Sequence, residues 1–328
     1  MTKTKFSIII PLKEFNDYLE ESIPNILSMD YKNFEIIILT NEKPSKIPNY
    51  LKNKKIKIIE TGKVSPAIKR DIGAKNSKGE YLAFLDDDAY PEKNWLNIAE
   101  QIFEEKKVAV IGGAAITPET DSTTQKASGL FFETLFGGGG LSYRYKPNKK
   151  SFYVDDFPTV NFIVSKKAFF DIGGFDNEFW PGEDTKFCRE LIKQNYPIWY
   201  SNELIVYHHR RKLFLPHLKQ IANYGKHRGY FAKKFPENSR KLTYFMPSIF
   251  LIGNAILFIL IFFNSNFFKL WVLLMGTYFS LITIDVFVRT LNIKIGILTI
   301  ITILLSHLTY GWKFIEGFLS KKIRSELR

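Results

Sequence analysis

Short apolar runs alternate with amphipathic segments along the N-terminal two thirds of the chain. Continuous apolar runs of strand length predict strands that are buried on both faces, and the segments with helical spacing predict the crossovers that parallel strands need. The predicted strands are residues 6–10, 34–39, 56–59, 81–85, 108–111, 160–164 and 204–207. The predicted helices are residues 18–27, 66–75, 95–105 and 182–194. This pattern predicts an α/β domain with a mostly parallel, Rossmann-like sheet.

The pattern changes near residue 242, where the chain becomes almost wholly apolar. Residues 242–263 would form a helix of about 33 Å, enough to cross a hydrocarbon core of about 30 Å. Residues 267–288 and 295–310 are two further candidates for membrane helices. Three full crossings would place the basic C-terminal tail outside, against the positive-inside tendency, so either one segment is re-entrant or the tail is an exception.

The chain therefore divides into a domain over 1–209, a basic amphipathic segment over 210–241 and a membrane part over 242–328. The net charge is +13, and residues 207–241 contribute ten Lys and Arg against one acid. Because this basic stretch lies directly before the apolar block, anionic headgroups and a lipid-linked acceptor are better partners than nucleic acid. Its first candidates for the acceptor and membrane interface are Arg210, Arg211 and Lys212.

Localisation is predicted from cysteine usage and from the start of the chain. Cys188 is the only cysteine, so no intrachain disulfide can form, and a reducing compartment fits. No signal peptide precedes the first strand. We expect a multi-pass protein of the cell membrane with its N-terminal domain in the cytoplasm.

Three adjacent carboxylates follow the predicted strand 81–85 directly. Ligands of open α/β sheets bind beyond the carboxyl ends of the strands. Asp86 and Asp88 are two residues apart, so in extended chain both point to the same side. This arrangement predicts a site for Mn²⁺ or Mg²⁺. The alternative is an acidic turn that only caps the following helix.

Another acidic pair and a histidine are the remaining candidates for chemistry. Glu183 and Asp184 begin a predicted helix, where either could act as a general base or merely cap the helix. His208 ends the last predicted strand and is a candidate metal ligand, the alternative being a surface histidine. His209 has a weaker claim because its side chain would point the other way. Trp180 could form a wall beside the acceptor or could pack in the core.

Several motifs, in this order and spacing, resemble the core of family 2 glycosyltransferases. They are Ile8-Ile9-Ile10-Pro11, Lys69-Arg70-Asp71-Ile72-Gly73-Ala74, the run from Gly79 to Asp88, Gly173-Gly174-Phe175-Asp176 and Gly182-Glu183-Asp184. The resemblance covers about residues 5–210 and implies a GT-A fold, a nucleotide-sugar donor (UDP-linked by expectation) and inversion at the anomeric carbon. It implies that Asp86 and Asp88 bind metal and that Asp184 is the catalytic base, with Glu183 as the alternative base or its orienting partner. It further implies donor-binding roles for Pro11, Asn41, Arg70 and Asp86.

Two positions depart from the family pattern. The loop after the second strand reads Thr40-Asn41-Glu42 where an aspartate is usual, and Arg70-Asp71 stands where Arg-Asn is usual. The stretch after residue 209 is similar to membrane-bound enzymes of the succinoglycan-synthesis type. The Gln-x-x-Arg-Trp motif of processive synthases is missing, since Gln220 is followed by Ile-Ala-Asn-Tyr.

These features predict an inverting, metal-dependent transferase that moves a sugar to a lipid-linked or nascent-glycan acceptor at the cytoplasmic membrane face. A polyprenyl-phosphate sugar synthase is an alternative with the same chemistry. A nucleotidyltransferase is an alternative of another class, although the residues after the first strand lack the Gly-rich basic loop usual there. A non-catalytic membrane scaffold is a further alternative.

Overall fold

The computed structural model describes residues 5–175 and 179–323, which form two compact units. We call them the sheet unit, residues 5–116 and 146–208, and the helical unit, residues 117–145 and 209–323. The division differs from the three consecutive segments expected from composition. Residues 117–145 belong with the C-terminal helices, although they lie within the stretch expected to form the N-terminal domain.

The sheet unit is built on one nine-stranded sheet with the order β3-β2-β1-β4-β8-β6-β9-β5, and β7 pairs with β9. Its strands are β1 (Phe6–Pro11), β2 (Phe34–Thr40), β3 (Ile56–Glu60), β4 (Tyr81–Phe84), β5 (Ala89–Pro91), β6 (Val110–Ile116), β7 (Phe152–Val154), β8 (Phe162–Ser165) and β9 (Ile198–His208). Strands β3, β2, β1 and β4 are parallel, as the apolar runs predicted. The sheet as a whole is mixed, because β8 runs antiparallel to both β4 and β6.

Strands β5, β7 and the first half of β9 are absent from the sequence prediction. β5 and β7 have three residues each, which is too short for a periodicity to show. The start of β9 is followed by Ser201, Asn202 and Glu203, where its pairing with β6 changes register. Because a bulge breaks the two-residue alternation, only the apolar second half of β9 has the pattern of a strand.

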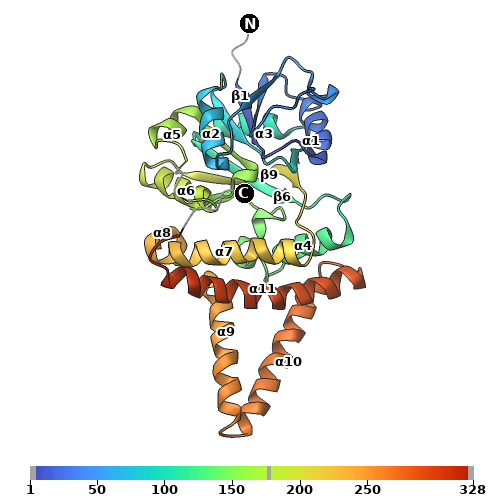
Figure 1. Ribbon diagram of the computed structural model, residues 1–328, viewed down its shortest axis with the longest axis vertical. Helices are drawn as coiled ribbons and strands as arrows, with labels where there is room; N and C mark the ends of the chain where they lie inside the picture. The colour runs from blue at the N-terminus through green and yellow to red at the C-terminus, as the bar shows by residue number, and fades with distance from the viewer. Residues whose placement is uncertain (1–4, 176–178, 324–328) are drawn as a thin grey trace. The chain divides into compact units, whose positions relative to one another are not determined.

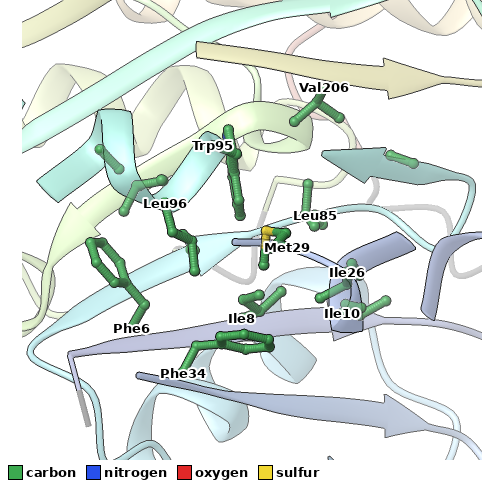
Figure 2. Packing of buried hydrophobic residues seen from close by; sticks show 14 of the residues in the cluster. Phe6, Ile8, Ile10, Ile26, Met29, Phe34, Leu85, Trp95, Leu96 and Val206 are labelled. Carbon is green, nitrogen blue, oxygen red and sulfur yellow. The ribbon is translucent and has the colours of Figure 1, made fainter. Parts of the chain in front are cut away.

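Helices cover the sheet on both faces. They are α1 (Asp17–Leu27), α2 (Pro66–Lys75), α3 (Trp95–Lys106), α5 (Lys166–Asp171) and α6 (Glu183–Lys193), with 3₁₀ turns η1 (Asn49–Leu51) and η3 (Thr159–Asn161). Phe6, Ile8 and Ile10 on one face of β1 pack with residues of α1 and α3 in the main core (Figure 2). On the opposite face, α2 lies so close to β1 that a Cβ at Gly73 would overlap the side chain of Ile9.

The helical unit contains α4 (Thr123–Glu133), η2 (Gly139–Arg144), α7 (Leu215–Lys234), α8 (Pro236–Ser239), α9 (Leu242–Ile261), α10 (Asn266–Phe287) and α11 (Ile293–Leu319). Helices α9 and α10 form a hairpin, and α11 lies across the open end of this hairpin, alongside α7 (Figure 1). By length and composition α9, α10 and α11 could each cross a membrane.

Candidate active site

The candidate site lies in the sheet unit, where several strands end. Asp86 and Asp88 follow β4, and His208 is the last residue of β9. Strand β5 connects these two segments, because Ala89 pairs with His208 in the antiparallel register of β5 and β9. As a result Asp88 Oδ1 lies 3.1 Å from His208 Nε2.

Asp86, Asp88 and His208 form a group of side chains that could hold a metal ion. Each offers one ligand atom, and these atoms all lie within 4.8 Å of one another. Asp88 is only 4 % exposed, so its charge is taken out of water and needs a compensating cation or hydrogen bonds. Two carboxylates and an imidazole are ligands that divalent transition metals accept, so the residues present fit a divalent cation.

Arg70 connects this group to the acidic pair at the start of α6. Its Nη2 donates to Asp86 Oδ1 at 2.9 Å, and its Nη1 donates to Glu183 Oε1 at 2.9 Å. The guanidinium is buried, and its pair with Glu183 is shielded from water, whereas the side chain of Asp86 is 32 % exposed. The two ion pairs hold the start of α6 beside the end of β4.

Glu183 and Asp184 have different surroundings although they are neighbours. Glu183 is buried, and burial raises the pKa of its carboxyl, with the charge of Asp184 acting in the same direction and Arg70 opposing both. Asp184 is half-buried in the first turn of α6, where its Oδ1 accepts from the backbone N–H of Thr185 at 2.7 Å. The helix dipole favours the ionised form of a carboxylate at this position.

Lys69 is a site residue that the sequence analysis missed. It lies next to Arg70 on α2 and donates to the backbone oxygen of Leu12, after β1, and to Asn41 Oδ1, after β2, the latter at 2.6 Å. Burial lowers the pKa of Lys69 to about 8, and the charge of Asp87 opposes this effect. Lys69 thus fastens together the ends of the two strands that carry the expected donor-binding residues Pro11 and Asn41. The available signal was a pair of cations on the helix face that also carries Ala67, Gly73 and Ala74.

Asp87, the middle carboxylate, does not belong to the metal-ligand group. It accepts from Asn16 Nδ2 at 2.5 Å, which links the β4 end to the start of α1. Burial raises the pKa of Asp87 to about 7, and the charges of Asp88 and Asp86 act in the same direction. Asn16 occupies the N-cap position of α1, but its side chain makes no capping hydrogen bond.

Asp71 replaces the asparagine usual in the family, and its role is visible in the structure. Its Oδ1 accepts from the backbone N–H of Phe175 at 2.9 Å, which ties α2 to the segment after α5. Burial raises the pKa of Asp71 to about 6, with the hydrogen bond from Phe175 opposing this effect. The acceptor oxygen would also be present in an asparagine.

The expected acceptor-side residues are distributed differently from the prediction. Trp180 is half-buried in the sheet unit, just before α6. Arg211 is half-buried and Lys212 is exposed. The expectation that Arg210 faces lipid headgroups is wrong, because its side chain is buried in the helical unit and its Nε donates to Thr117 Oγ1 at 3.1 Å.

His209 is directed away from the metal-ligand group, as the alternation along β9 predicted. Its Nδ1 lies 2.6 Å from Asp121 Oδ1, and both side chains are buried in the helical unit. Asp121 Oδ2 also accepts from the backbone N–H of Arg210 at 3.1 Å. Consecutive residues at the end of β9 therefore serve different units: His208 joins the metal-ligand group and His209 holds the helical unit together.

The mixed sheet, with an acidic group beyond β4 and an acidic helix start joined by one arginine, defines a glycosyltransferase of the GT-A fold. The family model of glycosyl transferase family 2 matches residues 7–173, half of the chain, and the chain belongs to this family.

Three comparisons place the chain among known proteins. It is 24 % identical over 242 residues to a dolichyl N-acetyl-α-D-glucosaminyl phosphate 3-β-D-2,3-diacetamido-2,3-dideoxy-β-D-glucuronosyltransferase of Methanococcus voltae, covering 70 % of this chain and 74 % of that protein. It is 27 % identical over 201 residues to a GalNAc(5)-diNAcBac-PP-undecaprenol β-1,3-glucosyltransferase of Campylobacter jejuni, covering 59 % and 62 % of the two chains. The mannosyltransferase PcManGT of Pyrobaculum calidifontis, solved with GDP-Man and Mn²⁺, shares the fold with a TM-score of 0.65 at 13 % identity, covering 98 % and 88 %.

Proposed function

We propose that this glycosyltransferase moves one sugar from a nucleotide sugar to a lipid-linked acceptor, with inversion at the anomeric carbon. The observation that carries the proposal is the double ion pair of Arg70, which joins Asp86 of the metal-ligand group to Glu183 of the acidic pair. The metal-ligand group and the acidic pair thereby belong to one network of ion pairs. The proposed donor is a sugar linked to uridine diphosphate, on the family resemblance alone.

In the proposed reaction Asp184 takes the proton of the acceptor hydroxyl while the acceptor oxygen attacks the anomeric carbon. The bond from that carbon to the nucleoside diphosphate breaks on the opposite side, so the configuration inverts. Asp184 is proposed as the base because Glu183 already pairs with Arg70 and is buried, whereas Asp184 is half-buried. Glu183 is then a positioning residue that holds Arg70.

Asp86, Asp88 and His208 are proposed to hold a divalent cation. The cation would neutralise the negative charge that develops on the departing diphosphate. Mg²⁺ prefers oxygen ligands, so the imidazole of His208 favours Mn²⁺. PcManGT, which shares the fold and was solved with Mn²⁺, supports this assignment.

The lipid-linked acceptor is proposed from two independent observations. The names of the Methanococcus and Campylobacter relatives give acceptors in which a sugar is linked to dolichyl phosphate and to undecaprenol diphosphate, respectively. The helical unit of this chain has three helices apolar enough to cross a membrane, so the enzyme would meet its acceptor at the bilayer. We propose that the sheet unit is on the cytoplasmic face, since nucleotide sugars are cytosolic metabolites and the segment before α9 is strongly basic.

A donor screen tests the proposed function. Purified full-length protein is incubated with Mn²⁺, a panel of nucleotide sugars and lipid-linked acceptors extracted from membranes. We expect one donor to release nucleoside diphosphate in the presence of acceptor, and chelation of the metal to stop the release. Formation of nucleotide sugar with release of pyrophosphate would instead establish the nucleotidyltransferase alternative.

A second experiment tests the acceptor class. Transfer to a lipid-linked acceptor should exceed transfer to the same sugar without its lipid by a large factor. Replacing Arg211 and Lys212 with glutamate should reduce transfer to the lipid acceptor more than hydrolysis of the donor by water. Arg210 is left unchanged because it is buried. Equal rates with the free and the lipid-linked sugar would contradict capture of the acceptor at the membrane.

A further inference from the structure

Helix α11 buries its small and polar side chains and exposes its large apolar ones, the reverse of an amphipathic helix in a soluble protein. Its buried face is made mostly of small and polar side chains: Gly296, Thr299, Thr302, Ile303, Ser306, Gly311, Phe314 and Gly317. Its exposed face carries large apolar side chains at helical spacing: Ile293, Ile297, Ile301, Leu308, Trp312 and Leu319. Such a face is stable only against an apolar environment, so something apolar covers α11 along its whole length.

The buried face of α11 packs lengthwise against a charged helix. Helix α7 carries five lysines and arginines and no acid. Its contacts with α11 extend from His217, whose Nε2 lies 3.1 Å from Ser306 Oγ, to Lys233, whose Nζ donates to the backbone oxygen of Ser320 at 2.5 Å. About 24 Å of α7 is therefore fastened to α11.

This packing is close as well as long. A Cβ at Gly229 of α7 would overlap the backbone oxygen of Phe314, and a Cβ at Gly317 of α11 would overlap that of Lys226. Lys226 also forms an ion pair with Glu316 at 3.1 Å. If α11 crossed the bilayer, α7 and its charges would have to enter the hydrocarbon with it. A lysine or arginine at the centre of a bilayer costs about 2.5–3.5 kcal/mol even by the most permissive scale.

Within the part of the chain that the structure describes, helices α9 and α10 have no such charged companion over most of their length. They are 20 and 22 residues long, about 30 and 33 Å, and match the hydrocarbon thickness. Their contacts with α11 lie in the half of the hairpin nearer its open end. There Phe245 packs on Phe314, a Cβ at Gly296 would overlap the ring of Phe287, and Tyr278 lies within hydrogen-bond distance of His307, at 2.8 Å. Toward the hairpin turn both helices expose large apolar side chains, among them Ile256, Phe258 and Ile259 of α9 and Leu270, Val272 and Leu273 of α10.

We propose that only α9 and α10 cross the membrane, and that α11 lies flat in the headgroup region with its apolar face against the same lipid surface. The occupant of that face is the bilayer itself, because the face is continuous with the exposed hairpin and the adjoining helix α7 and tail are basic. Two crossings return the chain to its starting side. The basic tail therefore remains on the side of the sheet unit, which satisfies the positive-inside tendency that three crossings violate.

Cysteine labelling tests the topology independently of any enzyme activity, so its failure leaves the proposed function untouched. Cys188 is buried and is replaced by serine, and single cysteines are placed at the exposed positions Lys54, Ser265, Lys294 and Lys321. Two preparations of sealed vesicles, one of each orientation, are treated separately with a membrane-impermeant maleimide. We expect Lys54, Lys294 and Lys321 to react from one side and Ser265, at the hairpin turn, from the other.

Two labelling results would overturn the proposal. Reaction of positions 294 and 321 from opposite sides would show that α11 crosses the bilayer. Reaction of position 265 from the side of Lys54, or from neither side, would show that the hairpin does not reach the opposite surface.

Depth measurements with spin labels provide a second test with a matched control. Ile297, Ile301 and Leu308 lie on the exposed face of α11, and Leu270, Leu274 and Leu281 are exposed at the same spacing on α10. In reconstituted full-length protein, oxygen and a polar nickel chelate should report one shallow depth for all three α11 positions, and clearly greater depths for positions 274 and 281. An α11 that crosses would place position 308 about 16 Å from position 297 along the membrane normal, and such a gradient would refute the flat orientation.

Discussion

Lys69 and Arg70 are sequence neighbours that serve opposite parts of the candidate site. Lys69 reaches the ends of β1 and β2, and Arg70 reaches Asp86 and Glu183. Both cations are buried, and a buried charge is stable only when its partners are in place. Through these two side chains, the first turns of α2 hold the expected donor loops, the metal-ligand group and the acidic pair in fixed positions relative to one another.

The roles of the acidic pair can be separated by conservative substitutions. Asp184→Asn keeps the shape and removes the basicity, so kcat should fall by at least ~10²-fold with little change in the apparent melting temperature. Glu183→Gln weakens the buried pair with Arg70, so it should lower the melting temperature as well as activity. Glu190→Gln, at an ion pair of α6 with Arg189, is the control and should change neither. An active Asp184→Asn beside an inactive, fully stable Glu183→Gln would reverse the two assignments.

The two consecutive histidines give a test of the metal-ligand group. His208→Ala should reduce Mn²⁺ affinity, measured by calorimetry, because His208 Nε2 lies beside Asp88. His209→Ala should leave Mn²⁺ affinity unchanged and lower the melting temperature, because it leaves the buried Asp121 without its imidazole partner. Equal effects of both substitutions on Mn²⁺ affinity would remove His208 from the proposed ligands.

Asp71 gives a prediction with a pH dependence. Burial raises the pKa of Asp71 from 3.8 to about 6, so the folded state holds its proton more tightly than the unfolded state does. The contribution of the protonated carboxyl to the free energy of unfolding is fully present below pH 4. It is lost as the pH rises to about 6, and the loss amounts to about 1–3 kcal/mol. Asp71→Asn keeps the acceptor for Phe175 and avoids this loss. Its melting temperature should therefore exceed that of the parent above pH 6 and approach it near pH 4.

The control for this measurement is Asp30→Asn at an exposed aspartate, which should show no such pH-dependent difference. If Asp71→Asn were less stable than the parent at pH 7, the carboxylate would be held by its charge and not merely by its hydrogen bond.

At the scale of elements, two contacts decide the architecture of the units. In the sheet unit the strand β5, only three residues long, brings Asp88 to His208 and so completes the metal-ligand group. In the helical unit the glycines of α7 and α11 allow the two backbones to approach closely. Both contacts join segments far apart in the sequence, and neither depends on local helix or strand propensity.

Glycine-to-alanine substitutions test the α7–α11 contact with matched controls in the hairpin. Gly229→Ala and Gly317→Ala insert a methyl group where backbone atoms already lie, so each should destabilise the detergent-solubilised protein by about 1–3 kcal/mol. Gly253→Ala and Gly276→Ala point into open space, and the better helix propensity of alanine should leave the melting temperature unchanged or slightly raised. Equal responses at all four sites would contradict tight packing of α7 on α11.

At the scale of the whole molecule, the chain combines a sheet unit that carries the candidate site with a helical unit whose helices α9, α10 and α11 are apolar enough to cross a membrane. The units are not consecutive, because residues 117–145 contribute α4 and η2 to the helical unit. The chain passes from the sheet unit into the helical unit after β6 and again after β9. Each unit has its own buried polar groups, as Asp88 and His209 illustrate.

The balance of apolar and charged contacts in the helical unit predicts how the protein leaves a membrane. A high-salt wash reduces the Debye length to about 3 Å and removes headgroup attraction to the basic residues. The apolar helices α9 and α10 are unaffected by salt, so the protein should stay in the membrane pellet and need detergent for release. Release by salt alone, detected by immunoblotting of the soluble fraction, would show that surface charge alone attaches the protein to the membrane.

The sequence by itself determined the class of fold, the family and the positions of the acidic motifs, because each rests on local patterns. An apolar run predicts a buried strand, and Asp86, Asp88 and Asp184 are recognised by their order along the chain. The helices apolar enough to cross a membrane were visible in the same way.

Tertiary structure decided the rest. The pairing of Arg70 with both acidic motifs, the hydrogen bonds of Lys69 and the burial of Arg210 and His209 depend on contacts between distant segments, which no local pattern encodes. The same holds for α11, whose composition equals that of a crossing helix. Its buried small and polar face became visible only with α7 packed against it, because hydropathy counts residues and does not record which of them another helix already covers.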